Sequence, residues 1–151
     1  YRKGTLYFFN NTVVSYRSDT TTLLRLSTND ESAEVFNNIV YCETGGSTLG
    51  IVNDSGVVNL SYNWLSAGYV ESHSSLSGSI TAADNLTGSD PLFTDYANEN
   101  FTLTSSSSAV NAGLQPDNPA TFLLFEYKKD SLQGVRATDD QLDIGAFEFN
   151  E

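Results

Sequence analysis

Three segments of the chain share one pattern, in which an aromatic residue precedes an asparagine and an apolar residue follows. They span residues 6–14, 33–41 and, in a weaker copy, 59–65. Aligning Asn11, Asn38 and Asn63 gives spacings of 27 and 25 residues. Self-similarity at a period of about 20–50 residues is typical of solenoid proteins, in which each repeat stacks on the one before it.

The recurrent asparagine suits a solenoid made of parallel strands. An asparagine at the same corner of each coil tolerates the left-handed turn conformation. Its amide can also bond to the asparagine of the neighbouring coil, as in stacked amide ladders. We therefore expect structural roles for Asn11, Asn38 and Asn63. The alternative interpretation is that the Asn-Asn pairs are ordinary turn residues of a β-sandwich.

The rest of the pattern also favours an all-β fold. No helical stripe of apolar residues extends beyond two turns, and short β-prone runs alternate with Gly, Asn, Asp and Ser. Residues 74–90 are rich in Ser, Gly, Thr and Asp and are predicted to form a loop. The weaker repetition after residue 75 predicts coils over residues 1–75, followed by a loop and a closing segment over residues 76–151.

Charge restricts the partners of the chain. The formal net charge is −12, and the seven basic residues are scattered along the sequence. Because nucleic-acid binding depends on neutralising phosphates with Lys and Arg, no nucleic-acid partner is expected. A polyanionic polysaccharide would be repelled unless cations bridged it to the protein.

The single cysteine and the termini carry further expectations. Cys42 lies in an apolar, strand-like run and is expected to be a buried, unreactive thiol. The sequence has no methionine, no signal peptide and no apolar run long enough for a transmembrane segment. We therefore expect a processed product or a fragment, with any targeting signal outside these residues.

The C-terminal half contains a distinctive series of short motifs. In order they are Asp-Pro-Leu-Phe at 90–93, Ser-Ser-Ala-Val-Asn-Ala-Gly at 107–113, Gly-Val-Arg at 134–136 and Asp-Ile-Gly-Ala-Phe-Glu at 143–148. This series resembles the C-terminal end of bacterial β-helix proteins of the pectin-lyase-like superfamily, including the choice-of-anchor Q type. The resemblance implies a right-handed parallel β-helix of about three coils with a C-terminal closing segment, in a secreted or cell-surface protein.

The small number of coils is a departure from that group, whose members carry many. An open solenoid end exposes unpaired strand edges and apolar core, and normally needs a cap or further coils. We therefore expect upstream coils, or another chain, to cover the N-terminal end. The chain is expected to be one domain, part of a longer protein.

No complete catalytic site is evident in the sequence. A polysaccharide lyase needs a cation or positive side chain to neutralise a uronate, together with a base. Arg25 with Asp30 and Glu34 is the best such cluster, although a solvated loop with an incidental ion pair explains it more simply. His73, the only histidine, is expected to be exposed and inactive, and no substrate-binding residue can be named.

Two interpretations compete for the acidic residues near the C-terminus. Asp139, Asp140 and Asp143 form a candidate Ca²⁺ site, although their spacing does not fit an EF-hand loop. The preferred interpretation is structural, with Arg136 bound to Asp143 and Glu148 so that the last segment is pinned to the coil before it. No cofactor is required by either interpretation.

The aromatic residues also allow two interpretations. Tyr62, Trp64 and Tyr69 are expected to fill the solenoid core, although each could instead stack on a sugar ring. Three functions then remain. The preferred one is a structural, closing portion of a secreted or cell-surface, carbohydrate-associated β-helix protein. The alternatives are part of a polysaccharide lyase or glycoside hydrolase, and an adhesin or filament-forming subunit whose ends stack between chains.

Overall fold

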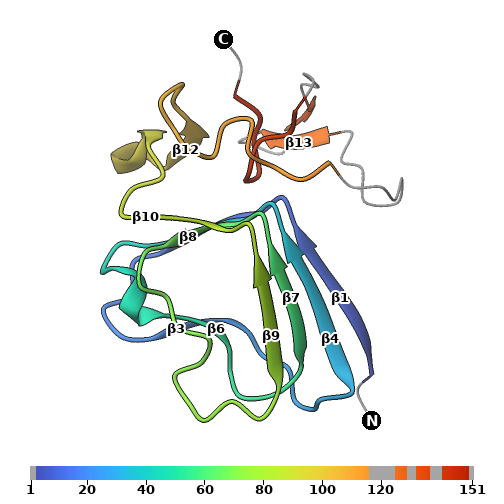
Figure 1. Ribbon diagram of the computed structural model, residues 1–151. Helices are drawn as coiled ribbons and strands as arrows, with labels where there is room; N and C mark the ends of the chain where they lie inside the picture. Colours follow the sequence, from blue (N-terminus) through green and yellow to red (C-terminus); the bar gives the residue numbers. More distant parts are fainter. Residues whose placement is uncertain (1–2, 116–124, 129–131, 137–140, 150–151) are drawn as a thin grey trace.

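The computed structural model describes residues 3–115, 125–128, 132–136 and 141–149 (Figure 1). In these ranges the fold is all-β, with two short 3₁₀ turns, η1 (Gly46–Thr48) and η2 (Tyr96–Asn98), and no α-helix. The chain winds about one axis for about three turns, and β-strands recur at equivalent places in successive turns. The predicted all-β parallel solenoid is confirmed.

Parallel pairing of strands from successive turns builds three faces. The first sheet has the order β1-β4-β7-β9 and the second the order β10-β8-β5-β2, while β3 and β6 pair on the third face. The first sheet contains β1 (Gly4–Phe9), β4 (Glu31–Phe36), β7 (Val57–Ser61) and β9 (Ser79–Ala83). The other two contain β2 (Thr12–Ser15), β5 (Ile39–Cys42), β8 (Trp64–Ser66), β10 (Leu86–Gly88), β3 (Thr21–Leu24) and β6 (Leu49–Val52).

The solenoid continues past the predicted boundary at residue 75. The segment 74–90, predicted to be a loop, contains β9 and β10, which pair in parallel with β7 and β8. The chain thus begins a further turn after the third before it leaves the solenoid. Residues 79–82 are one of the short β-prone runs of the sequence, but the Ser, Gly, Thr and Asp residues around them favoured a loop over the whole segment.

The interior of the solenoid is formed by alternate residues of each strand. Val35, Val58 and Leu60 of the first sheet meet Val40 and Leu65 of the second in one buried cluster. Since alternate side chains of a strand point to opposite faces, the intervening residues point outward. Cys42 is buried in this interior cluster, as expected.

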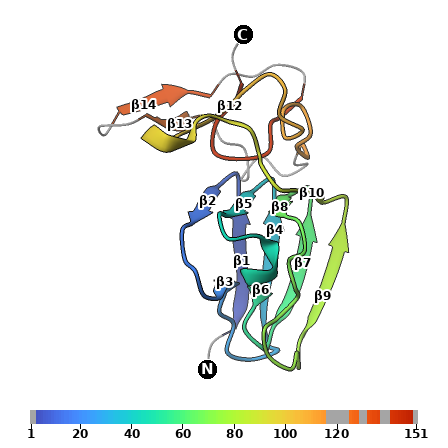
Figure 2. The same cartoon turned by 90° about the vertical axis from the view of Figure 1, so that its left-hand side faces the viewer.

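Two antiparallel hairpins follow the coils. They pair β11 (Phe93–Asp95) with β12 (Asn100–Leu103), and β13 (Phe125–Lys128) with β14 (Leu132–Val135). With the described residues of 141–149 they form what we call the C-terminal block, the described part of residues 89–149. Figures 1 and 2 show this block along the outer side of the second sheet.

A second apolar core lies between this sheet and the C-terminal block. Ile39 and Trp64 point outward from β5 and β8, and pack in one cluster with Phe93, Leu103 and Ile144 of the block. The second sheet is therefore buried on both faces. The segment expected to close the stack thus covers one side of it.

Glycine at position 145 permits a close approach of the block to the coils. Gly145 donates a hydrogen bond from its backbone N–H to the carbonyl of Asn37 at 2.9 Å. Its φ is +115°, and an added Cβ would lie 2.8 Å from Cδ1 of Ile39. Neither the backbone conformation nor the space suits a side chain here.

We therefore expect the Gly145→Ala variant to lose about 2 kcal/mol of unfolding free energy, because a non-glycine residue is strained at this φ and clashes with Ile39. Urea denaturation measures the loss. Gly4→Ala is the matched control, because Gly4 also has a positive φ but has nothing within 4 Å of an added Cβ. Equal losses in the two variants would show that backbone strain alone, and not docking of the block, is responsible.

Candidate functional site

The asparagines of the repeat form a hydrogen-bonded ladder along the solenoid. The backbone N–H and the amide Nδ2 of Asn11 both donate to Oδ1 of Asn38 at 3.0 Å. Asn38 donates in the same way to Oδ1 of Asn63, at 3.0 and 2.9 Å. Asn38 and Asn63 are fully buried. The middle of the ladder therefore links coils through groups that have no access to water, whereas Asn11 at its end is partly exposed.

A fourth asparagine belongs to this ladder. The backbone N–H and Nδ2 of Asn63 donate to Oδ1 of Asn85 at 3.0 and 2.9 Å. Asn85 in turn donates through Nδ2 to the carbonyl of Leu60 at 2.8 Å. The repeat pattern does not extend to Asn85 because no aromatic residue precedes it. A signal was available, because Asp84-Asn85 resembles the Asn-Asn pairs at 10–11 and 37–38, and Asn85 follows Asn63 by 22 residues.

The left-handed corner lies one residue earlier than expected. The positive φ angles belong to Asn10, Asn37, Tyr62 and Asp84, at 53°, 55°, 53° and 53°. The ladder asparagines that follow them keep negative φ values. Tyr62 therefore lies at a left-handed corner of the backbone. In each coil one residue adopts the left-handed turn, and the asparagine after it provides the amide of the ladder.

Arg136 is buried at the centre of the C-terminal block. Its guanidinium forms a salt bridge with Glu148, and both side chains are almost inaccessible to water. It also donates to the carbonyls of Ala146 at 3.0 Å and Gly145 at 3.3 Å. Oε2 of Glu148 accepts from the backbone N–H of Asp143 at 2.9 Å. These contacts tie Arg136 to the final segment.

Asp143 is buried beside this pair and receives backbone donors. Its carboxylate accepts hydrogen bonds from the N–H of Asn111, at 2.7 Å, and from the N–H of Phe149. It therefore joins the final segment to the Ser-Ser-Ala-Val-Asn-Ala-Gly motif. Asp139 and Asp140, the other members of the candidate Ca²⁺ site, lie outside the described residues. Within the described ranges no cluster of three metal-binding side chains occurs.

Burial perturbs the titration of Glu148. Desolvation raises its pKa above the ordinary value, and the opposing effects of the Asp143 N–H and the Arg136 guanidinium are smaller. A carboxyl whose pKa is higher in the folded state binds its proton more tightly there. Its contribution to stability is present at low pH and is lost as pH rises from the unfolded pKa, about 4.3, through the folded pKa.

We expect the Glu148→Gln variant to lose this pH dependence, because glutamine keeps the side-chain shape and does not titrate. The difference in unfolding free energy between parent and variant should change in favour of the variant as pH rises through that window. Urea denaturation at a series of pH values from about 4 upward measures it. A constant difference, or one moving in the parent's favour, would contradict the assigned direction of the pKa.

The structure does not gather the residues of the possible lyase cluster. Asp30 forms an exposed salt bridge with Lys3 at 3.5 Å, and Glu34 accepts a hydrogen bond from Nδ2 of Asn59 at 2.8 Å. Among the described residues, Arg25 forms no salt bridge with Asp30 or Glu34. His73 is exposed, as expected, with its Nε2 at 3.0 Å from the carbonyl of Thr48.

The outer face of the first sheet carries a row of hydrogen-bonding side chains. The register of the parallel strands places Tyr7, Glu34, Asn59 and Thr81 side by side, one from each strand. Tyr7 is 57% exposed. Because the C-terminal block covers the second sheet instead, this row stays open to solvent and is the candidate binding surface.

The aromatic residues are placed differently from the sequence prediction. Trp64 points away from the solenoid interior and lies in the second core, 6.4 Å between ring centroids from Tyr41. Tyr41 also meets Phe93 and Tyr96 edge to face. Tyr69, by contrast, packs against the interior cluster. Among Tyr62, Trp64 and Tyr69, the prediction of a core role in the solenoid holds for Tyr69 alone.

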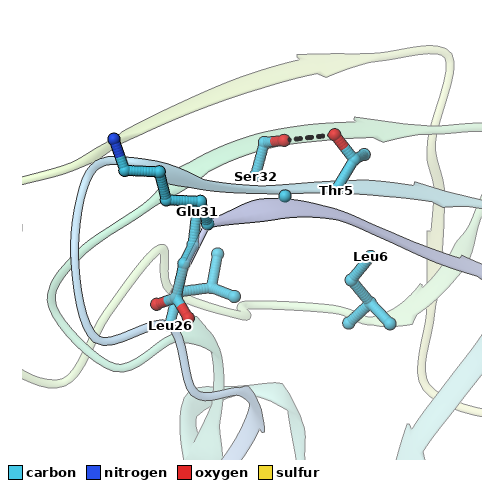
Figure 3. Close-up of a pocket in the computed structure, with 7 residues that line it drawn as sticks. Thr5, Leu6, Leu26, Glu31 and Ser32 are labelled. Carbon is cyan, nitrogen blue, oxygen red and sulfur yellow. Dashed lines mark hydrogen bonds between the residues drawn. The ribbon is translucent and has the colours of Figure 1, made fainter. Parts of the chain in front are cut away.

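A shallow pocket of about 270 Å³ lies at the first coil. Figure 3 shows Thr5 hydrogen-bonded to Ser32 there, with Leu6 on the other side of the strand. Its one acid, Glu31, already accepts hydrogen bonds from the backbone N–H groups of Ser27 and Thr28. Because that carboxylate is occupied in shaping the turn, the pocket offers few free groups for chemistry.

Together these features define an all-β parallel solenoid of about three turns, with an asparagine ladder at one corner and a block packed on one side. In the described part of the chain, no helix has the length and apolar character to cross a membrane. No family model, no curated protein and no solved structure matches the chain.

Proposed function

We propose that this chain is a structural, closing portion of a secreted or cell-surface β-helix protein associated with carbohydrate. The observation that carries the proposal is the difference in exposure between the outer faces of its two four-stranded sheets. One sheet is sealed by the C-terminal block, and the other presents an open row of polar and aromatic side chains. The order of motifs in the block supports membership of the bacterial pectin-lyase-like group, and with it right-handed winding, the usual hand of parallel crossovers.

The open row has the chemistry of a sugar-binding surface. A tyrosine ring offers an apolar face for stacking, while the carboxylate of Glu34 and the amide of Asn59 supply an acceptor and a donor. The net charge of −12 favours a neutral polysaccharide over a polyanion. The role needs no cofactor, since binding rests on side chains alone.

The proposal is tested with a panel of neutral and acidic polysaccharides. Affinity electrophoresis should show retardation of the parent chain by at least one neutral polysaccharide. The Tyr7→Ala variant should lose it. Tyr16→Ala is the matched control, because Tyr16 is 51% exposed but packs near Tyr96 of the C-terminal block.

The same samples separate the structural role from an enzymatic one. We expect no new reducing ends and no unsaturated products after prolonged incubation with any member of the panel. Depolymerisation would favour the lyase or hydrolase alternative. Retardation that survives in Tyr7→Ala but disappears in Tyr16→Ala would place binding elsewhere and would overturn the assignment of the open row.

A further inference from the structure

The first coil ends the asparagine ladder with a vacant acceptor. Along the ladder, each Oδ1 accepts from the asparagine one coil earlier, as Asn38 accepts from Asn11 and Asn63 from Asn38. Asn11 belongs to the first coil, and no described residue donates to its Oδ1. The face of the solenoid at β1 and β2, which we call the head, therefore offers an acceptor in ladder register.

The opposite face, at β9 and β10, ends the ladder with vacant donors. The backbone N–H groups of Asn11, Asn38 and Asn63 each donate to the Oδ1 of the next asparagine. The equivalent N–H of Asn85 makes no hydrogen bond to a described residue, and its Nδ2 donates only to Leu60. This face, which we call the tail, offers the groups that the head lacks.

The side chains of the two faces are complementary in size as well. The register of the first sheet places Leu6 and Phe8 of the head in the same interior columns as Ile80 and Ala82 of the tail. Leu6 is 43% exposed because no coil lies over it. Ala82 is exposed for the same reason. If the head of one molecule met the tail of another, the large Phe8 would therefore meet the small Ala82.

Strand edges provide the third element of complementarity. β1 and β2 end their sheets at the head, and β9 and β10 end the same sheets at the tail. Within the chain, every pairing in these two sheets is parallel. Placing β1 of one molecule beside β9 of another continues that pairing without any change of direction, and does the same for β2 and β10.

From these matches we propose that copies of this chain stack head to tail, with Asn85 of one molecule donating to Oδ1 of Asn11 in the next. The contact is heterologous, so it does not close on itself and it generates a growing stack. The net charge of −12 per copy opposes association, and added salt strengthens it by screening. The inference is independent of the proposed carbohydrate association.

The test uses variants that block one face each. Leu6→Lys puts a charge on the head and Ala82→Lys on the tail, whereas Ala83→Lys puts the same charge on the outer face of the same strand, outside the open row. Sedimentation velocity of the parent should show a mass that grows with concentration and with salt, beyond twice the monomer. The Ala83→Lys control should behave as the parent does.

Each face-blocked variant alone should remain monomeric, with a far-ultraviolet circular dichroism spectrum like that of the parent. An equimolar mixture should form a species of twice the monomer mass and nothing larger, because only one intact head and one intact tail can meet. A parent that stays monomeric at every concentration would overturn the proposal and leave the faces to other occupants. Association of Ala82→Lys alone to parent-like masses would overturn it as well.

Discussion

Replacement of Arg136 by alanine is expected to lower the free energy of unfolding by about 3–5 kcal/mol, because it leaves the buried Glu148 without its charged partner. The variant also loses two donors to the carbonyls of Gly145 and Ala146. Since Gly145 contacts the coils at Asn37, the damage should reach the docking of the C-terminal block.

The fluorescence of Trp64 reports the docking of the block, because Trp64 is the only tryptophan of the sequence and lies between the second sheet and the block. Its emission should shift to longer wavelength in Arg136→Ala as water reaches the ring. The control is Arg25→Ala, which removes an exposed arginine that forms no salt bridge with a described residue. Equal stability of Arg136→Ala and the parent in urea would show that the salt bridge does not hold the final segment.

Replacement of Asn38 by alanine is the second large effect that we expect, at about 3 kcal/mol of unfolding free energy. The substitution removes the acceptor of the Asn11 N–H and the donor to the carbonyls of Phe8 and Phe36. Leaving a buried polar group unsatisfied costs about 1–3 kcal/mol, whereas a typical hydrogen bond contributes about 1 kcal/mol. The φ of Asn38 is not positive, so alanine introduces no backbone strain there.

A matched control is available in the next coil. Asn59→Ala removes the same side chain from an exposed position, where its amide donates only to Glu34. We expect less than about 0.5 kcal/mol there, as for other surface substitutions. Thermal and urea denaturation of the two variants measure the difference. Similar losses would mean that the ladder contributes no more than a surface amide.

The sequence predicted the solenoid because its determinants are local. An aromatic residue, an asparagine and an apolar residue recur together in the first three coils, between the first-sheet strand and the second-sheet strand. The further turn at β9 and β10 was not predicted, because Asp84-Asn85 follows Ala82 and Ala83 and not an aromatic residue. Residues 79–82 are β-prone in sequence, but their place in a further coil follows only from their pairing with the coil before them.

The position of the C-terminal block was not predictable in the same way. The outward orientation of Trp64 follows from strand alternation, yet an outward tryptophan needs a partner, and the partner lies far along the chain at Phe93 and Ile144. Such contacts leave no periodic trace in the sequence. The pairing of Arg136 with Glu148 was anticipated from charge, whereas the role of Asp143 as an acceptor for Asn111 and Phe149 was not.

The sheet that is buried on both faces links the length of the solenoid to the length of the block. Residues facing the block come from all the turns, including Val14, Ile39, Trp64 and Leu86. Duplication of one coil during evolution would add outward apolar side chains that the block does not cover. Deletion of one coil would leave apolar side chains of the block without a sheet to pack against. Coil number in such a chain can therefore change only together with a compensating change in the segment that follows.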